Sequence, residues 1–157
     1  MTTASRHHMI VTVATLLLTW VVAGVANAVG FIMGYEPTAV GVVATLVAVC
    51  GWLAAGWFAG SRSEASFLRF ATILWTIVVV GGPFAFWALE ASPGMSATQG
   101  GLVLPLLLFV LVAPLYGLYA LLPLGEPIVQ SAVVGVVVFV MTLVAYYAAR
   151  RIGAAAE

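Results

Sequence analysis

Five long runs of apolar residues constrain this chain more than any other feature of its sequence. They cover residues 9–33, 39–60, 67–89, 101–122 and 128–149, and together they contain a single charged residue, Arg69. A helix of about 20 apolar residues crosses the hydrocarbon core of a bilayer, so each run is long enough to span. We therefore predict an all-α fold: a polytopic transmembrane helix bundle with five spans, which forms one integral membrane domain over residues 1–157.

The composition supports this fold class. Apolar residues make up 64% of the chain and charged residues 6%, whereas about a quarter of the residues of a soluble domain are charged. A transmembrane β-barrel would show short segments of alternating hydrophobicity, and these runs are continuous. The lipid bilayer is therefore the expected surrounding, and a formal net charge of zero predicts no nucleic-acid partner.

The end of the first run imitates the cleavage site of a secretory signal, with Ala26 and Ala28 at the required spacing. The apolar run nevertheless continues past Ala28 to residue 33. This length is enough to cross a bilayer, so we expect the run to be retained as the first span.

The fourth run raises a question of topology, because residues 105–127 contain four prolines. Proline removes a backbone donor, and irregular backbone at membrane depth must be surrounded by protein or water. Ten leucines lie between Leu102 and Leu122, and at about −0.5 kcal/mol each they favour spanning by roughly 5 kcal/mol. We predict that this run crosses the membrane with a kink at Pro114.

Four spans plus a re-entrant fourth segment are the alternative, and the arginines favour it. Four crossings place every arginine on one side, with Glu36, Glu90 and Glu126 on the other. Five crossings divide the arginines three against two, which is a weak bias under the positive-inside rule. We expect a prokaryotic cytoplasmic (inner) membrane with the N-terminus in the cytoplasm, although the balanced charge also permits insertion in both orientations.

Small residues predict where the helices approach one another. In lipid, helices associate through close backbone contact and hydrogen bonds rather than by hiding apolar surface. The contact faces hold Asn27 in the first run and Thr45 in the second. The predicted helix-packing residues are two glycine pairs with GxxxG spacing, Gly30 and Gly34, and Gly56 and Gly60. We expect them to pack helices within the chain rather than to form a dimer face.

Three tryptophans and the single cysteine are predicted core residues. Trp20, Trp52 and Trp75 lie deep in their runs, where each indole N–H needs a hydrogen-bond partner. Cys50 lies in an apolar run and has no second cysteine to pair with. We expect it to be a small buried side chain rather than a reactive thiol.

The most polar stripe of the sequence lies along the third run. The polar residues that share it are Arg69, Thr72, Thr76 and Glu90. Pro83 lies between them and is expected to bend the helix, and polar groups beside a broken helix are typical of a hydrophilic path or a small-ligand site. The alternative is that the charged residues lie at opposite membrane interfaces and the threonines bond to their own helix.

The sequence lacks the motifs of common catalytic and cofactor sites. It contains no Asp, no HExxH, no CxxC and no glycine-rich phosphate loop. His7 and His8 are adjacent in a polar tail, without the nearby Asp, Cys or Glu that would complete a metal site. We therefore predict that the protein is not an enzyme and has no catalytic residue, metal or cofactor.

These observations favour a small multi-pass membrane protein that acts as a non-enzymatic accessory or scaffold helix bundle. The alternative is a small-solute transporter or channel subunit that acts as an oligomer around the third helix. The expected partners are the lipid bilayer and either further copies of the chain or another membrane protein. The sequence identifies neither a substrate nor a specific partner.

Overall fold

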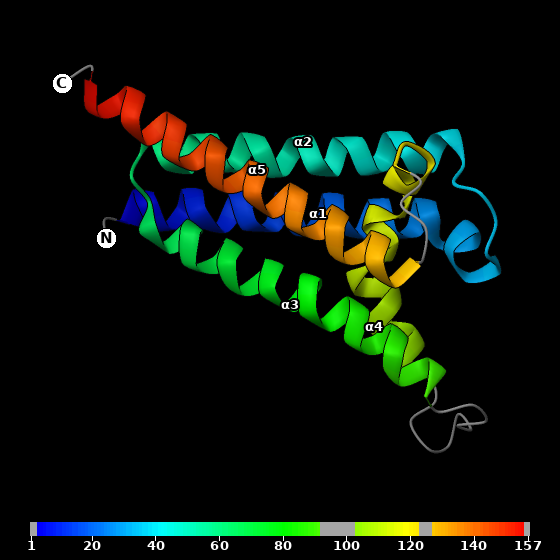
Figure 1. The fold of residues 1–157 in the computed structure, drawn as a ribbon. Coiled ribbons are helices and arrows are strands. Elements are labelled where there is room, and N and C mark those ends of the chain that lie inside the picture. Colours follow the sequence, from blue (N-terminus) through cyan, green and yellow to red (C-terminus); the bar gives the residue numbers. More distant parts are fainter. Residues whose placement is uncertain (1–2, 92–102, 123–126, 156–157) are drawn as a thin grey trace.

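The long helices of the chain lie side by side and alternate in direction (Figure 1). The computed structural model describes residues 3–91, 103–122 and 127–155, and for residues 3–7, 127–128 and 131 it describes the backbone alone. The elements are α1 (Thr3–Met33), α2 (Ala39–Ser61), α3 (Ala65–Glu90), α4 (Val103–Leu111), the 3₁₀ helix η2 (Ala113–Ala120) and α5 (Pro127–Ala155). No strand occurs in these ranges.

The predicted fold class, an all-α membrane bundle with four or five spans, is confirmed. Four segments are long and apolar enough to cross a membrane: His8–Met33, Ala39–Ser61, Ala65–Glu90 and Ala132–Ala155. The pair α4 and η2 passes the same test together, but the chain bends by 57° between them. The number of crossings therefore depends on the path of this bent pair.

The bent pair enters the bundle and leaves it at the same end. Leu104, near the start of α4, packs in a cluster with aromatic side chains from the last turns of α1 and α3. At the break between α4 and η2, Pro114 lies against Gly24, near the middle of α1. The chain then returns, and the hydroxyl of Tyr116 donates to the carbonyl of Tyr35, just beyond the C-terminal end of α1.

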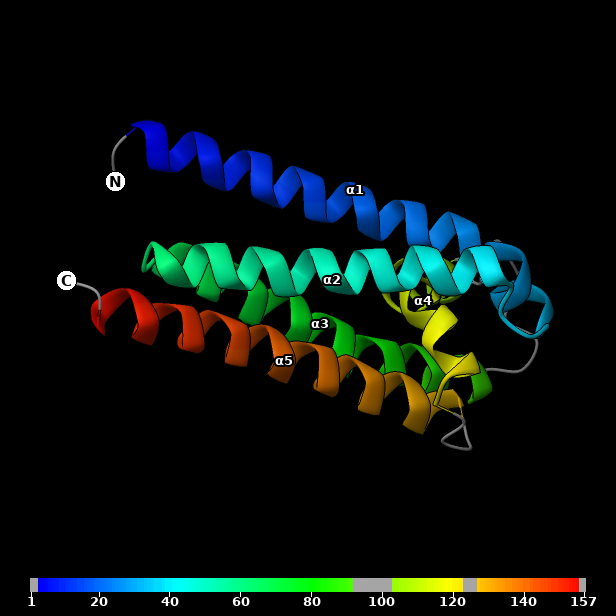
Figure 2. The same ribbon diagram turned by 90° about the horizontal axis from the view of Figure 1, so that it is seen from above.

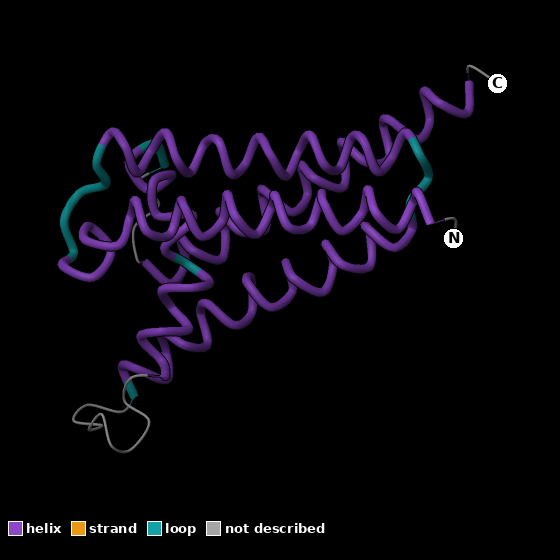
Figure 3. The backbone as a smooth tube through the Cα atoms, turned by 180° about the vertical axis from the view of Figure 1, so that it is seen from behind, coloured by secondary structure: helices purple, strands orange, loops and turns teal. Residues whose placement is uncertain are grey.

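These contacts favour the alternative of four spans plus a re-entrant segment over a fourth run that crosses the bilayer. The start of α1 and the end of α5 accordingly lie at the same end of the bundle (Figure 1 and Figure 3). The leucine content does not distinguish the two topologies, because the segment packs into protein, where Leu108, Val112 and Leu115 are buried. Neighbouring helices supply the polar partners that its backbone requires, so the segment itself needs few polar residues.

Glycines of α2 make its contact with α5 close. A Cβ atom at Gly56 would lie 2.8 Å from the carbonyl oxygen of Thr142, and one at Gly60 would overlap the backbone of Tyr146. Real Cβ contacts are longer than this, so a side chain at either position would push the two helices apart. In lipid, such close backbone approach is a main source of helix association.

The other glycine pair has a different role. A Cβ atom at Gly30 would lie 3.4 Å from the ring of Tyr116 in η2, so this glycine faces the re-entrant segment. Gly34 follows the last residue of α1 and has a φ of 67°, the left-handed conformation that commonly ends a helix at glycine. No described atom lies within 4 Å of its Cβ position, so Gly34 ends α1 rather than packing two helices.

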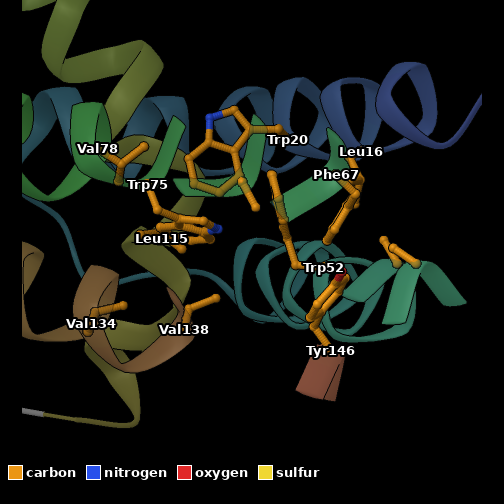
Figure 4. Packing of buried hydrophobic residues seen from close by; sticks show 13 residues of the cluster. Leu16, Trp20, Trp52, Phe67, Trp75, Val78, Leu115, Val134, Val138 and Tyr146 are labelled. Atoms are coloured by element: carbon orange, nitrogen blue, oxygen red, sulfur yellow. The ribbon is translucent and has the colours of Figure 1, made fainter. Parts of the chain in front are cut away.

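The predicted burial of three tryptophans is confirmed. Trp75 lies edge-on to both others, with ring centroids 5.6 Å from Trp20 and 5.4 Å from Trp52. Figure 4 shows Trp75 beside Leu115, so this aromatic cluster joins α1, α2 and α3 to the re-entrant segment. Of the three indole nitrogens, that of Trp20 has a hydrogen-bond partner in the described part of the chain, and those of the other two do not.

The topology predicts that both termini lie on one side of the membrane. A reporter that is active on one side alone, fused in separate proteins before α1 and after α5, should be active in both fusions or in neither. The same reporter inserted between α1 and α2 should give the opposite result. Termini in opposite compartments would mean that the fourth run crosses in the membrane.

The packing of α2 on α5 predicts that Gly60→Ala lowers the free energy of unfolding by about 1–3 kcal/mol, the usual cost of overpacking. The matched control is Gly51→Ala in the same helix, because the nearest atoms to its Cβ position are 3.8 Å away. Alanine also favours helix over glycine, so this control should be neutral or stabilising. Reversible unfolding in mixed micelles measures both, and equal losses would contradict the assigned contact.

Candidate functional site

The predicted polar path lies on the outside of the bundle. Its four residues, Arg69, Thr72, Thr76 and Glu90, are all exposed on α3. This helix continues through Pro83 without interruption, and the hydroxyl of Thr76 donates to the carbonyl of Thr72 within it at 2.8 Å. The four residues therefore share one helix surface but enclose no space, and a path along this surface would need a second molecule to close it.

The histidines and the cysteine do not gather into a reactive cluster. Cys50 is exposed on the outer surface of α2, which corrects the prediction that it is buried. His8 lies near the start of α1, and the side chain of His7 lies outside the described residues. In the described part of the chain, no group of three or more His, Cys, Asp or Glu side chains could hold a metal ion.

Buried hydrogen bonds instead gather at the break between α4 and η2. Pro114 has no N–H, so the carbonyl of Val110, four residues before it, lacks its helical partner. The indole Nε1 of Trp20 donates a hydrogen bond to this carbonyl at 2.8 Å. The proline thus frees an acceptor at mid-depth, and a side chain of α1 satisfies it.

Thr45 of α2 provides a hydrogen-bond donor for a second carbonyl at the break, that of Pro114. Its hydroxyl donates to the carbonyl of Pro114 at 2.9 Å and accepts from Nδ2 of Asn27, also at 2.9 Å. The Asn27 amide donates as well to the carbonyl of Ala23 in its own helix, at 2.9 Å. Asn27 is 2% exposed and Thr45 is fully buried. We call Trp20, Asn27 and Thr45 the polar lock, because they tie α1 and α2 to the break.

Two glycines provide the space for the polar lock. A Cβ atom at Gly117 in η2 would lie 2.5 Å from Oγ1 of Thr45, and one at Gly41 in α2 would overlap Oδ1 of Asn27. This Oδ1 has no conventional hydrogen-bond donor among the described residues. Larger residues at these two positions would separate the three segments.

The polar lock is suited to holding backbone rather than to chemistry. An indole, an amide and a hydroxyl do not titrate near neutral pH, and their donors are directed at carbonyl oxygens or at one another. A backbone carbonyl without a donor costs several kcal/mol in the hydrocarbon region, where no water can replace the donor. The polar lock therefore removes the main cost of a broken helix inside the bundle.

Sequence reasoning placed Asn27 and Thr45 on contact faces but did not connect them with the fourth run. The available signal was Pro114, because an internal proline always frees the carbonyl four residues earlier. The sequence offered no way to choose the donor, since Trp20 lies 90 residues away from that carbonyl. The choice depends on how the fourth run enters the bundle.

The described grooves are apolar and open to the outer surface. One groove of about 550 Å³ lies between α1 and α3, lined by five α1 residues between Met9 and Leu17 and by Ser66 and Phe70 of α3. Another, of about 350 Å³, lies between α2 and α5. Neither presents the several convergent polar groups that orient a polar ligand in a typical small-molecule site.

No protein-family model, no curated protein and no solved structure matches this chain.

The polar lock predicts that Thr45→Val, which keeps the shape of the side chain, lowers the free energy of unfolding by about 1 kcal/mol. Interhelical hydrogen bonds in membrane proteins contribute about 0.6 to 1.7 kcal/mol, less than the full cost of a carbonyl without a donor, because the unfolded chain also finds partners for these groups. The matched control is Thr15→Val, because the exposed hydroxyl of Thr15 bonds to the Val11 carbonyl of its own helix. Unfolding in mixed micelles should show little change for the control, and equal losses in both variants would contradict the role of Thr45.

Proposed function

We propose that this protein is a non-enzymatic accessory or scaffold helix bundle that works through its outer, lipid-facing surfaces. The observation that carries the proposal is the use of the buried polar side chains. Trp20 and Thr45 hold the backbone of the re-entrant segment, and the buried hydroxyl of Thr142 donates to a carbonyl of its own helix. Enzyme sites instead bring polar groups together in a pocket that a substrate can enter.

We propose further that the arginine-bearing end of the bundle faces the cytoplasm of a prokaryotic cell. The start of α1, the turn between α2 and α3, and the end of α5 share one end of the bundle (Figure 1). These segments carry Arg6, Arg62, Arg150 and Arg151 together with one acid, Glu64, whereas Glu36 and Glu90 belong to the opposite end. Arginine in short loops favours the cytoplasmic side, so this partition supports cytoplasmic termini.

The outer face of α3 is the surface that we assign to a partner. It exposes two hydroxyl residues, Thr72 and Thr76, where the outer face of α5 exposes valines and a methionine between Val133 and Val144. Hydroxyl groups on a helix surface can hydrogen-bond to a facing helix in lipid, and small or hydroxylated residues are enriched at such interfaces. The partner on this surface is a second copy of the chain or another membrane protein.

A photo-crosslinking amino acid at Ile73, on the outer face of α3, is expected to give one discrete protein adduct in cells. The matched control is the same amino acid at Val144 of α5, because these two residues are 63% and 62% exposed. The control should crosslink to lipid alone, and mass spectrometry of the adducts distinguishes the two outcomes. Lipid adducts alone at Ile73 would contradict the assigned surface.

The second candidate function is a small-solute transporter or channel subunit that acts as an oligomer. Two observations favour it: a broken, re-entrant segment inside the bundle, and a stripe of Thr72 and Thr76 that several copies could place around an axis. In a Cys50→Ala background, cysteines at Thr72 and Thr76 would then react rapidly with a charged thiol reagent. On the accessory proposal both cysteines face lipid or a partner helix, and neither is expected to react.

A further inference from the structure

The re-entrant segment fills the space between α1 and α3 over one part of its length only. α4 packs on α3 and η2 packs on α1, and the break between them reaches Trp20, near the middle of α1. Beyond this point, towards the arginine-bearing end, α1 diverges from the neighbouring helices (Figure 2). Direct backbone contact between α1 and α3 is sparse, and the groove of about 550 Å³ lies between these two helices.

The walls of this α1–α3 groove are preformed. Phe70, which lines it, stacks on the buried ring of Trp52 with centroids 6.1 Å apart and planes 11° from parallel. Leu16 and Trp20 are buried in the same cluster behind the groove. Its volume falls in the range of about 300–1,000 Å³ that is usual for small-molecule sites, and its lining is apolar apart from Ser66.

The segment that contains Ser66, at the arginine-bearing end of the groove, carries a positive balance. Arg62 and Arg69 are both exposed and lie on either side of Ser66 in sequence. Glu64 is the acid in this stretch, and as the N-cap of α3 it makes no side-chain hydrogen bond to the first turn. Two arginines against one glutamate leave one net positive charge, and the positive end of the α3 dipole adds to it.

The length of the groove decides between a lipid and a helix as its occupant. It follows α1 from Met9 to Leu17, which at about 1.5 Å per residue is roughly 13 Å. A partner helix needs about 30 Å to cross the hydrocarbon core, whereas one leaflet of that core is about half as thick. The groove therefore has the depth of one leaflet, and the buried Trp20 marks its inner limit.

We propose that the α1–α3 groove binds one anionic phospholipid of the surrounding leaflet. An acyl chain lies along the α1 residues between Met9 and Leu17 and against Phe70, and the phosphate lies at the rim beside Ser66 and Arg69. Basic residues between transmembrane helices at the cytoplasmic side are suited to anionic headgroups. The acyl-chain contacts lie apart from the outer face of α3 that we assign to a partner, whereas Arg69 belongs to both.

Native mass spectrometry of the purified protein in detergent tests the proposal, with phosphatidylglycerol and phosphatidylcholine of identical acyl chains as probes. One phosphatidylglycerol molecule should remain bound, and it should raise the melting temperature more than phosphatidylcholine does. Arg69→Gln should weaken phosphatidylglycerol binding about fivefold, the loss expected for one arginine near an anionic headgroup. Arg151→Gln, at the same end of the bundle but on α5, is the matched charge control and should change binding little.

Filling the groove tests its location. Ala14→Trp should abolish retention of phosphatidylglycerol, whereas Ala44→Trp, in a shallow groove at the other end of α2, should not. The lipid-free melting temperature of each variant reports its folding, and Ala14→Leu replaces the larger substitution if that one unfolds the bundle. Equal binding of both lipids, or full retention by the Ala14 variants, would overturn the proposal. A lipid-free dimer that Ala14→Trp disrupts would overturn it in favour of a second copy.

Discussion

A carbonyl oxygen without a donor, in a place without water, is the constraint on which this structure depends. Pro114 creates such a carbonyl at Val110, and the carbonyl of Pro114 itself lies at the same break, at the start of the 3₁₀ helix. Trp20 and Thr45 donate to these two oxygens. Without these donors, an interrupted helix inside the hydrocarbon region would be too costly, because lipid offers no hydrogen bonds.

The depth of the re-entrant segment has consequences at both ends of the bundle. On the side where it enters, α4 and η2 separate α1 from α3 and fill the space with leucine, valine and aromatic side chains. On the other side nothing in the described chain takes their place, and the α1–α3 groove remains. The turn at Pro114 therefore divides the space between α1 and α3 into two halves. One half is tightly packed by α4 and η2, and the other is a groove that is open to the lipid leaflet.

The positions of the arginines were more informative about the membrane topology than the hydrophobicity of the fourth run. The ten leucines of the fourth run favoured a full crossing because leucine prefers hydrocarbon to water. A protein interior satisfies the same preference, so leucine content does not separate burial in lipid from burial among helices. The partition of the arginines does separate the two topologies, because it depends on which end of each helix reaches the cytoplasm. In the same way, the helical spacing of Arg69, Thr72 and Thr76 predicted a shared face but not the outward direction of that face.

The sequence by itself determined that a lipid bilayer surrounds this protein, and it determined the class of its fold and the positions of its four long helices. These follow from local composition and run length, which act along the chain. Tertiary structure alone decided that the fourth run turns back, that Trp20 and Thr45 are its donors, and that Gly60 faces α5 while Gly34 ends a helix. Each of these depends on contacts between segments far apart in sequence, and the apolar pattern of a membrane helix is nearly the same on all its sides.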